Sequence, residues 1–415
     1  MIAARSARRL ILAAALLGLA LRLAFGLLYW VDKPMTHDER EYLSLSRSLT
    51  QGRGFVHDDA EDPGTGQRFG RAPGYPVFLA LIGAGTLPPP DATPPGVKIA
   101  QSGLGALLVG LIAGIAWLAA GPHAAVAAAL VAAVYPSLVW TPAQVLSETL
   151  YSVVALAAAL LLQIAADRSS GAGTRRGALV PGVGAGLLVG TAVLVRPAML
   201  FFVPLAVLWL VATRRRALTI VLLTATLAIV APWTARNYRV HGRFVLVASE
   251  GGVTFWTGNH PLARGEGDLA ANPLIKQAEL EFRRRHPGLT PDELEPLYYR
   301  DALRHIAASP VWWLGLTARK AFYTVVPIGP SYALHSLRYR LASTLPYLLI
   351  LPWAVAGIRR LWRGPRRPAA PFLLGASAVL VCLVFFPQER FRIPIIDPLL
   401  IVGAAAALRP DPQSS

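Results

Sequence analysis

Two adjacent carboxylates, Asp38 and Glu39, follow directly on the first long apolar segment of the chain. Ionisable side chains at the edge of a membrane-length apolar segment have no packing reason to be there, which makes them candidates for function. An acidic pair in such a place can accept a proton, hold a cation or bind sugar hydroxyls. Tyr42, Leu45 and Leu49 then recur at helical spacing, so the pair is expected to open a helix.

The composition is that of a polytopic membrane protein. Hydrophobic residues make up 54% of the 415 residues and charged residues only 15%, against roughly 25% charged residues in a soluble domain. The formal net charge of +17 does not indicate a nucleic-acid partner, because the basic residues cluster in short runs between apolar segments. Cys382 is the only cysteine, which excludes an internal disulfide and a cysteine-ligated metal site.

Ten apolar segments approach the length needed to cross a bilayer, about 20 residues. They cover residues 10–30, 98–120, 123–140, 149–166, 179–195, 197–213, 217–233, 343–358, 369–386 and 393–408. If these spans alternate, four arginine clusters and both termini fall on one side, which the positive-inside rule identifies as the cytoplasm. All acidic residues except Asp167 and Asp411 then lie on the outer face or at its membrane edge, so chemistry is expected there.

The spans leave two long outer loops, at residues 31–97 and 234–342, within what we interpret as a single integral membrane domain over residues 1–415. The first loop carries the Asp38 pair. In the second, Thr290-Pro-Asp-Glu293 predicts a helix that begins with a capping box and has proline at its first position. The second loop is too small for a large separate catalytic domain.

Each outer loop contains an apolar stretch that does not fit as a span. Residues 72–85 are too few, and residues 311–328 carry Arg319 and Lys320 near their middle. We expect both stretches to be helices that lie on the outer leaflet, with their basic side chains reaching water. A re-entrant or paired-span arrangement remains the alternative.

Several arginines lie at the outer membrane edge, against the usual bias. A guanidinium has a planar fork that suits phosphate, although lipid head groups alone would also tolerate basic residues there. Arg390 and Arg392, with Glu389, form the best set because the last loop is too short to be a mere linker. Snorkelling is the alternative for Arg196. The arginines of this group are Arg71, Arg196, Arg236, Arg390 and Arg392.

Short motifs along nearly the whole chain resemble one family of enzymes. Asp38-Glu39-x-x-Tyr42, Gly52-x-Gly54-Phe55 and Arg71-Ala-Pro-Gly-Tyr-Pro76 look like the first outer loop of bacterial polyprenyl-phosphate-dependent glycosyltransferases. These are GT-C membrane enzymes similar to the protein O-mannosyltransferases, the lipid A aminoarabinose transferase and the RgtA/B/C/D-like sugar transferases. Further matches, in the same order, are Leu146-Ser-Glu148, Arg196-Pro197, Pro232-Trp-Thr-Ala-Arg-Asn-Tyr238 with His241-Gly242, Gly258-Asn259 and Glu389-Arg-Phe-Arg-Ile-Pro394.

The resemblance implies an all-α bundle of the GT-C type, with about ten transmembrane helices and interfacial helices in the outer loops. It also implies an inverting transferase of the bacterial inner membrane. Such an enzyme moves a hexosyl or pentosyl group from a polyprenyl-phosphate donor to a lipid, glycan or protein acceptor at the periplasmic face. One displacement at the anomeric carbon needs a base for the acceptor proton and positive charge for the departing phosphate, but no second nucleophile.

The resemblance also suggests residue roles. It places the base at Asp38, whose pKa the neighbouring apolar surface would raise; an ion pair with Arg40 or a helix N-cap is the alternative. Glu39 is expected to bind hydroxyls or a cation. Glu148 is expected to approach Asp38 and share a divalent cation with it, or else to pair with its helix macrodipole. Sugar or acceptor contacts, with turn or structural roles as the alternative, are expected at Tyr75, Asn237 and Asn259.

Two other functions compete with glycosyl transfer. A lipid-linked sugar transporter or flippase would favour inverted repeats and ionisable groups near mid-membrane, and the sequence shows neither. An O-antigen ligase or polymerase would carry a dominant His or Arg cluster in a late large loop rather than an early acidic pair. The transferase hypothesis requires Asp38, Glu148 and the final-loop arginines to surround one outward-facing cavity.

Overall fold

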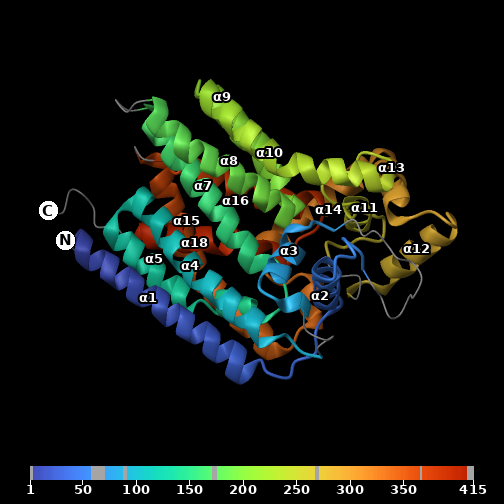
Figure 1. Cartoon of the computed structure of the whole chain (residues 1–415), viewed down its shortest axis with the longest axis horizontal. Helices are drawn as coiled ribbons and strands as arrows, with labels where there is room; N and C mark the ends of the chain where they lie inside the picture. The colour runs from blue at the N-terminus through green and yellow to red at the C-terminus, as the bar shows by residue number, and fades with distance from the viewer. Residues whose placement is uncertain are drawn as a thin grey trace.

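The structure is a computed structural model that describes residues 3–57, 71–86, 91–170, 175–266, 271–364 and 367–408. Over these residues the chain is helical, and its one β-pairing is an isolated bridge between Pro34 and Ala92. Long apolar helices form a bundle with both termini at one end, and α2 and α11–α13 gather at the opposite end (Figure 1). The predicted all-α polytopic membrane fold is confirmed.

Within the described residues, six helices are long and apolar enough to cross a membrane. They are α1 (Ala4–Ala24, continued by a π-helical turn to Tyr29), α4 (Pro95–Ala120), α7 (Glu148–Ser170), α8 (Arg175–Val195), α10 (Arg216–His241) and α15 (Leu337–Arg363). The pair α5 (Pro122–Val134) and α6 (Pro136–Trp140) would make a seventh, bent by 61°. The other predicted spans are shorter helices, namely α9 (Phe202–Ala212), α16 (Ala369–Val384) and α18 (Ile396–Ala407).

The bend between α5 and α6 has a local cause in Pro136. Proline has no N–H, so the carbonyl of Ala132 loses its intrahelical partner. Nη2 of Arg22, from the buried face of α1, donates to that carbonyl at 3.2 Å. Gly18 and Gly105 leave the room this needs, because a Cβ at either would lie 2.7 or 2.5 Å from the Arg22 side chain. An arginine inside the bundle thus repairs the backbone break.

Close helix contacts elsewhere in the bundle rely on glycine. Helix α7 packs along α8, α8 along α10, and α15 along α18. A Cβ at Gly186 or Gly190 of α8 would lie 2.8 Å from a carbonyl oxygen of α10. Small residues at such positions let helix backbones approach closely, which is the usual packing mode inside membranes.

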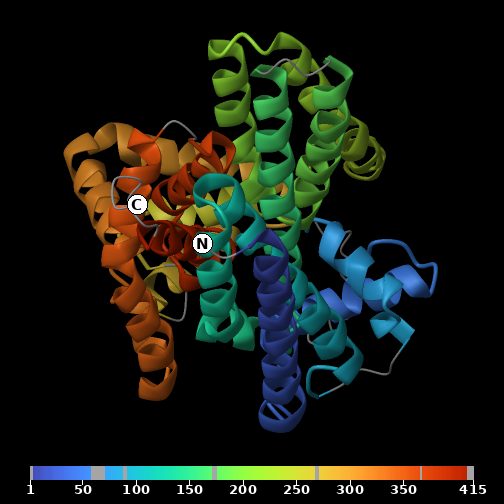
Figure 2. The same ribbon diagram turned by 90° about the vertical axis from the view of Figure 1, so that its left-hand side faces the viewer.

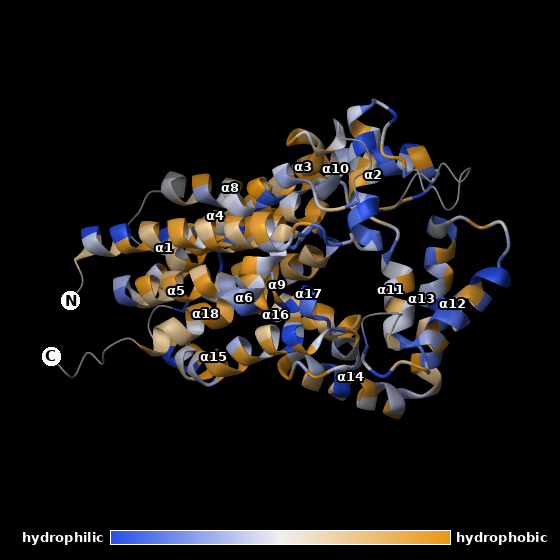
Figure 3. Ribbon diagram, turned by 90° about the horizontal axis from the view of Figure 1, so that it is seen from below, coloured by the Kyte–Doolittle hydropathy of each residue, from blue (hydrophilic) through white to orange (hydrophobic). Residues whose placement is uncertain are grey.

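The end opposite the termini is built from shorter, more polar helices, as the concentration of hydrophilic residues there shows (Figure 3). The predicted capping box of α13 is confirmed, since Oε2 of Glu293 accepts a hydrogen bond from the Thr290 N–H at 2.9 Å. The helices concerned are α2 (His37–Thr50), α3 (Gly74–Leu81), α11 (Gly251–Asn259), α12 (Pro273–Arg284), α13 (Pro291–Ala308), α14 (Pro310–Val325) and α17 (Glu389–Arg392).

The two apolar stretches of the outer loops form α3 and α14. Eight residues at 1.5 Å each cannot cross a hydrocarbon core of about 30 Å, so α3 alone is not a span. The expectation that Lys320 of α14 reaches water is wrong. Its side chain is fully buried, and Nζ donates to Oδ1 of Asn259 at 3.0 Å and to the Leu383 carbonyl at 3.3 Å. The end of α16 needs donors for its last carbonyls, and Lys320 supplies one.

The arginine-bearing turns lie at the end that carries the termini, which faces the viewer in Figure 2. Nε of Arg215, between α9 and α10, donates to Oγ of Ser169 at the end of α7 at 3.0 Å, so two of these turns are neighbours. Asp411 lies outside the described residues. The separation of arginine turns from acidic helices fits the predicted orientation, and which side is cytoplasmic stays a prediction.

Candidate active site

Asp38 lies in the first turn of α2 and pairs with two arginines from distant parts of the chain. Its Oδ2 accepts a hydrogen bond from Nη1 of Arg390 at 2.7 Å, and its Oδ1 accepts one from Nη2 of Arg71 at 3.0 Å. The side chain keeps 30% of its exposure, so solvent reaches it. The carboxylate is therefore held firmly but remains open to a ligand.

Glu148 begins α7 and is almost completely buried. Its Oε1 accepts a hydrogen bond from Nε of Arg390 at 2.7 Å and lies 3.2 Å from Nη1 of Arg196. One guanidinium, that of Arg390, therefore bridges Glu148 and Asp38. These contacts confirm the expected approach of Glu148 to Asp38 and bring in Arg196 beside them.

Arg71 connects Asp38 to two carboxylates that no sequence pattern singled out. It forms an ion pair with Glu41, and its Nε lies 3.3 Å from Oε1 of Glu250. Its guanidinium also lies over the ring of Tyr42, 5.0 Å from the centroid. Glu41 is three residues after Asp38, so helical spacing could have placed both on one face. Glu250 is distant in sequence from both Asp38 and Arg71, and only the tertiary structure places it beside Arg71.

These pairings set the protonation of the acids. Burial alone would raise the pKa of Asp38, but the guanidiniums of Arg390 and Arg71 outweigh it and hold that pKa well below its usual range. The expectation of a raised pKa is therefore wrong, because opposite charges surround this carboxylate. Burial raises the pKa of Glu250 to about 7, although Arg71 lowers it, and Glu41 adds to the rise. An ionised acid thus lies beside one that titrates near neutrality.

Comparison with known proteins identifies the fold. No protein-family model matches the chain, and no curated protein matches its sequence. The structure of the archaeal oligosaccharyltransferase AglB from Archaeoglobus fulgidus, in complex with an inhibitory peptide and a dolichol-phosphate, matches with a TM-score of 0.57 at 15% identity. The match covers 97% of this chain and 50% of that one, so the chain spans about half the length of AglB. The chain has the GT-C fold.

A second GT-C structure, ArnT from Cupriavidus metallidurans bound to undecaprenyl phosphate, matches with a TM-score of 0.45 at 15% identity. That match covers 97% of this chain and 78% of ArnT. At 15% identity, the AglB match establishes a shared fold alone. The roles of individual residues have to come from the geometry of the Asp38 cluster itself.

The predicted divalent cation between Asp38 and Glu148 does not fit the donor set. The cationic guanidinium of Arg390 already pairs with both carboxylates. Among the described residues, no three His, Cys, Asp or Glu side chains gather in a way that could hold a metal ion. Arg390, and not a metal ion, therefore links Asp38 and Glu148.

Glu39, expected to bind hydroxyls or a cation, is instead engaged by the protein. Its Oε2 accepts from the N–H of Thr36 at 2.8 Å and completes the capping box of α2. Its Oε1 accepts from the N–H of Val145 at 2.9 Å and faces the hydroxyl of Thr93 at 3.5 Å. Glu39 is buried and ties α2 to the segment that leads into Glu148. It positions the cluster and is left out of the proposed chemistry.

Tyr75, expected to cover the sugar, is fully buried beneath α2. Its ring packs edge-on against Tyr42 with centroids 4.9 Å apart, and its hydroxyl donates to Oε1 of Gln101 at 3.3 Å. The side chain therefore supports Tyr42, over which Arg71 lies, and does not face a ligand.

Asn237 and Arg236 hold the segment that delivers Glu250. Helix α10 continues past the predicted end of its span to His241, because its C-terminal glycine, Gly242, comes only there, with φ +67°. Nδ2 of Asn237 then donates to the carbonyls of residues 245 and 247 at 3.1 and 3.2 Å. Arg236 donates to Oδ1 of Asn237 at 3.2 Å and lies 4.8 Å from the ring of Trp233.

Asn259 is a structural clamp at the end of α16. Its Nδ2 donates to the carbonyls of Phe255 and Val384 at 2.8 and 2.9 Å. Its Oδ1 accepts from Nε1 of Trp313 and Nζ of Lys320, both at 3.0 Å. All of its hydrogen-bonding capacity is used within the protein, so it fixes the segment before α17 and has none left for a sugar.

Glu389 and Arg392 flank Arg390 in α17 but have different partners. Nε of Arg392 lies 2.9 Å from Oδ1 of Asp397, and its guanidinium lies 4.2 Å from the centroid of the Tyr347 ring. Glu389 bonds to Ser343. The final-loop set predicted from the sequence is thus divided, with only Arg390 reaching Asp38 and Glu148.

Proposed function

We propose that the chain is an inverting glycosyltransferase that moves a sugar from a polyprenyl-phosphate donor to a lipid, glycan or protein acceptor. The observation that carries the proposal is the Arg390 bridge, in which one guanidinium is shared by Asp38 and Glu148 beside Arg196. The GT-C fold supports it, since AglB, which shares that fold, was solved with a dolichol-phosphate.

The donor phosphate would bind to the arginines and release Asp38. Arg390 and Arg71 each pair with Asp38. A phosphate offers these guanidiniums the same planar, charge-assisted hydrogen bonds and competes for them. Once the phosphate neutralises the two arginines, the main cause of the low Asp38 pKa is removed, and the carboxylate becomes a better proton acceptor.

Transfer would then be a single displacement. The acceptor hydroxyl oxygen bonds to the anomeric carbon while the bond from that carbon to the phosphate oxygen breaks, and Asp38 takes the hydroxyl proton. Arg390 and its neighbours stabilise the charge that returns to the polyprenyl phosphate. One displacement inverts the anomeric centre, and the mechanism needs no covalent intermediate.

Asp38 belongs to α2, which lies at the end opposite the termini (Figure 1). If the arginine turns face the cytoplasm, as the positive-inside rule predicts, this end faces the periplasm of a bacterial inner membrane. The polyprenyl tail would remain in the bilayer while the phosphate and the sugar reach the cluster at the outer surface.

The test is transfer by the purified full chain in nanodiscs, with undecaprenyl-phosphate-linked hexoses and pentoses as donors and envelope extract as acceptor. We expect Asp38→Asn to lower transfer by about 100-fold or more, the contribution of a general base. Donor binding should remain, and the chain should stay folded at the assay temperature, although its thermal midpoint falls because Arg390 and Arg71 each lose an ion pair. Asp32→Asn, an exposed acid in the same loop, is the matched control. A fully active Asp38→Asn variant would remove the base assignment.

A further inference from the structure

Helix α17 is a single turn held on two sides by different helices. On one side, Arg390 donates to Asp38 of α2 and Glu148 of α7. On the other side, Nε of Arg392 lies 2.9 Å from Oδ1 of Asp397, in the first turn of α18. At 3.6 residues per turn, positions two apart lie about 200° apart around the helix axis, so the two arginines point in nearly opposite directions. An anchor therefore stands behind Arg390.

The backbone of α17 does not by itself fix the direction of Arg390. A helix of four residues is too short to be stable alone. Its hydrogen bonds run along the axis, as where the Ile393 N–H donates to the Glu389 carbonyl at 3.0 Å, and they allow the whole turn to rotate about that axis. The contacts of its side chains therefore decide where the Arg390 guanidinium points.

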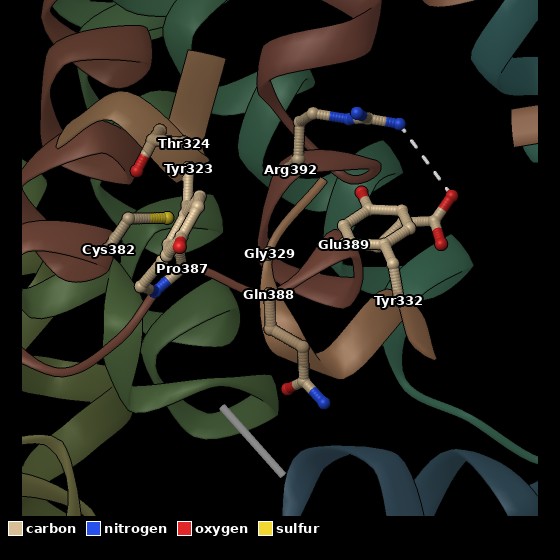
Figure 4. A pocket seen from close by; sticks show the side chains of 9 residues that line it. All are labelled: Tyr323, Thr324, Gly329, Tyr332, Cys382, Pro387, Gln388, Glu389 and Arg392. Carbon is tan, nitrogen blue, oxygen red and sulfur yellow. Dashed lines mark ion pairs between the residues drawn. The ribbon is translucent and has the colours of Figure 1, made fainter. Parts of the chain in front are cut away.

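Arg392 is fixed firmly enough to set that rotation. Its side chain is 3% exposed. From α15, the centroid of the Tyr347 ring lies 4.2 Å from its guanidinium, and Oγ of Ser343 accepts a hydrogen bond from its Nη2 at 3.3 Å. Figure 4 shows the Glu389 carboxylate facing the end of the Arg392 side chain, and these two groups form an ion pair at 3.6 Å. Arg392 thus ties α17 to α15 as well as to α18.

Asp397 supplies the charge that keeps Arg392 in this place. It is fully buried, and Arg392 is its ion-pair partner among the described residues. A carboxylate in the first turn of a helix also interacts favourably with the macrodipole, so stabilising α18 is the simplest role for Asp397. That role needs no arginine, however, and a buried charge without a partner is costly. The pairing with Arg392 makes the position of α17 depend on α18.

We propose that Asp397 is a positioning residue for Arg390. By holding Arg392, it fixes the rotation of α17 and keeps the Arg390 guanidinium directed at the two acids of the cluster. Asp397 acts only through this chain of contacts and touches no reacting group. The inference rests on the proposed function and deepens it, because Arg390 is the residue proposed to receive the donor phosphate.

The first experiment removes the anchor without leaving a buried charge behind. Asp397→Asn leaves the Arg392 charge without this partner, so its thermal midpoint should fall. The pair Asp397→Val with Arg392→Met removes both charges, and apolar replacement of a buried ion pair is often neutral for stability. Glu389, whose pKa burial raises to about 7, can take up a proton once Arg392 is gone. The paired variant should therefore unfold at a higher temperature than Asp397→Asn.

Binding of undecaprenyl phosphate to the full chain in nanodiscs then separates positioning from stability. The dissociation constant of the paired variant should rise at least about fivefold over that of the native chain, as for loss of one hydrogen bond, because Arg390 is no longer directed at the site. A purely structural Asp397 would leave this constant unchanged in a chain that remains folded. Glu279→Gln, at a buried glutamate of α12 paired with Arg283, is the matched control and should bind as the native chain does.

A mutant cycle supplies a second measurement that does not depend on the proposed function. Thermal unfolding is compared for the native chain, Asp397→Asn, Arg390→Lys and the double variant. A purely structural Asp397 predicts additive effects, because Asp397 and Arg390 have different ion-pair partners. Positioning predicts that Arg390→Lys lowers the thermal midpoint less in the Asp397→Asn chain than in the native chain, because the contacts of Arg390 are already weakened there. Glu279→Gln combined with Arg390→Lys should be additive.

The proposal is overturned if the paired variant binds undecaprenyl phosphate as tightly as the native chain, or if the cycle is strictly additive. A coupled cycle in a native chain that neither transfers sugar nor binds undecaprenyl phosphate keeps the positioning role and removes the proposed function. Transfer together with an additive cycle removes only the positioning role.

Discussion

At the scale of single residues, the cluster depends on Arg390, whose guanidinium donates hydrogen bonds to two different carboxylates. Nε serves Glu148 and Nη1 serves Asp38, each at 2.7 Å. Only a planar guanidinium presents two donors in directions that reach both acids at once, whereas lysine is a point charge. Removing either acid would leave this half-buried guanidinium with one partner missing, so the cluster acts as a unit.

Arg390→Lys should therefore weaken donor binding even though it keeps the charge. We expect the dissociation constant for an undecaprenyl-phosphate-linked sugar to rise about tenfold or more, as for loss of a charge-assisted hydrogen bond. Binding is measured by titration in nanodiscs. Arg340→Lys, an exposed arginine of α15, is the control. Equal donor affinity in the Arg390→Lys variant and the native chain would mean that the bridge is purely structural.

Glu250 gives a pH-dependent signature. Burial raises its pKa from 4.5 to about 7, so the folded state keeps a proton that the unfolded state loses over this interval. Stability of the native chain should fall as the pH rises from about 4.5 to about 7 and then level off. Glu250→Gln mimics the protonated form. Its thermal midpoint should therefore rise relative to that of the native chain as the pH increases from about 4.5 to about 7.

The control for Glu250 is Glu281→Gln, at an exposed glutamate of α12. Its thermal midpoint should follow that of the native chain at every pH. If the Glu250→Gln and native chains keep a constant difference from pH 4 to pH 8, the Glu250 carboxyl does not titrate in this window.

At the scale of elements, two buried basic side chains donate hydrogen bonds to backbone carbonyls that have no partner within their own helices. Arg22 of α1 donates a hydrogen bond to the carbonyl that Pro136 leaves without a partner at the bend between α5 and α6. Lys320 of α14 and Asn259 donate hydrogen bonds to the last carbonyls of α16, just before α17. Buried carbonyls of this kind cannot reach water, so these donors remove the cost of leaving them unpaired.

Arg22→Met should destabilise the fold by about 1–3 kcal/mol, because it leaves a buried carbonyl without a donor. Adding Pro136→Ala restores an N–H for the Ala132 carbonyl, so the double variant should recover part of the loss. Thermal unfolding of the two single variants and the double variant forms a mutant cycle. Arg5→Met, at an exposed arginine of the same helix, is the control. Strict additivity would argue against the Arg22–Pro136 coupling.

At the scale of the whole molecule, the two ends of the long axis differ in polarity. The termini lie at one end, and α2, which carries Asp38, lies at the other (Figures 1 and 3). Because the candidate site and the arginine turns lie at opposite ends, a lipid-borne phosphate can bind at one membrane surface while the arginine turns face the other. The proposed donor and its acceptor must therefore meet on the α2 side of the membrane.

Cysteine labelling tests this orientation. In a Cys382→Ser chain, Gln51→Cys at the end of α2 should react with a membrane-impermeant maleimide on intact spheroplasts. Thr213→Cys, in the turn after α9, should react only after permeabilisation. Both native side chains are exposed, so access depends on the membrane side. The opposite pattern would place Asp38 in the cytosol and remove the outer-face proposal.

The sequence by itself determined the local features of this protein. Hydropathy located the helices of the bundle, and the Thr290 capping box located the start of α13. These features depend on neighbouring residues and on helical periodicity, which a sequence displays directly. The resemblance of ordered motifs pointed to the GT-C fold and to Asp38 and Glu148, which were expected to meet the final-loop arginines; of these arginines, Arg390 joins the cluster.

Only the tertiary structure decided which side chains meet and which are already engaged. Arg390 reaches Asp38 across 352 positions of sequence, and Glu250 joins through Arg71 without any local signal. Glu39, Asn259 and Lys320 looked available but satisfy buried backbone. A side chain's partners, and hence its pKa and its freedom to bind a ligand, are set by packing between distant segments, which no local pattern encodes.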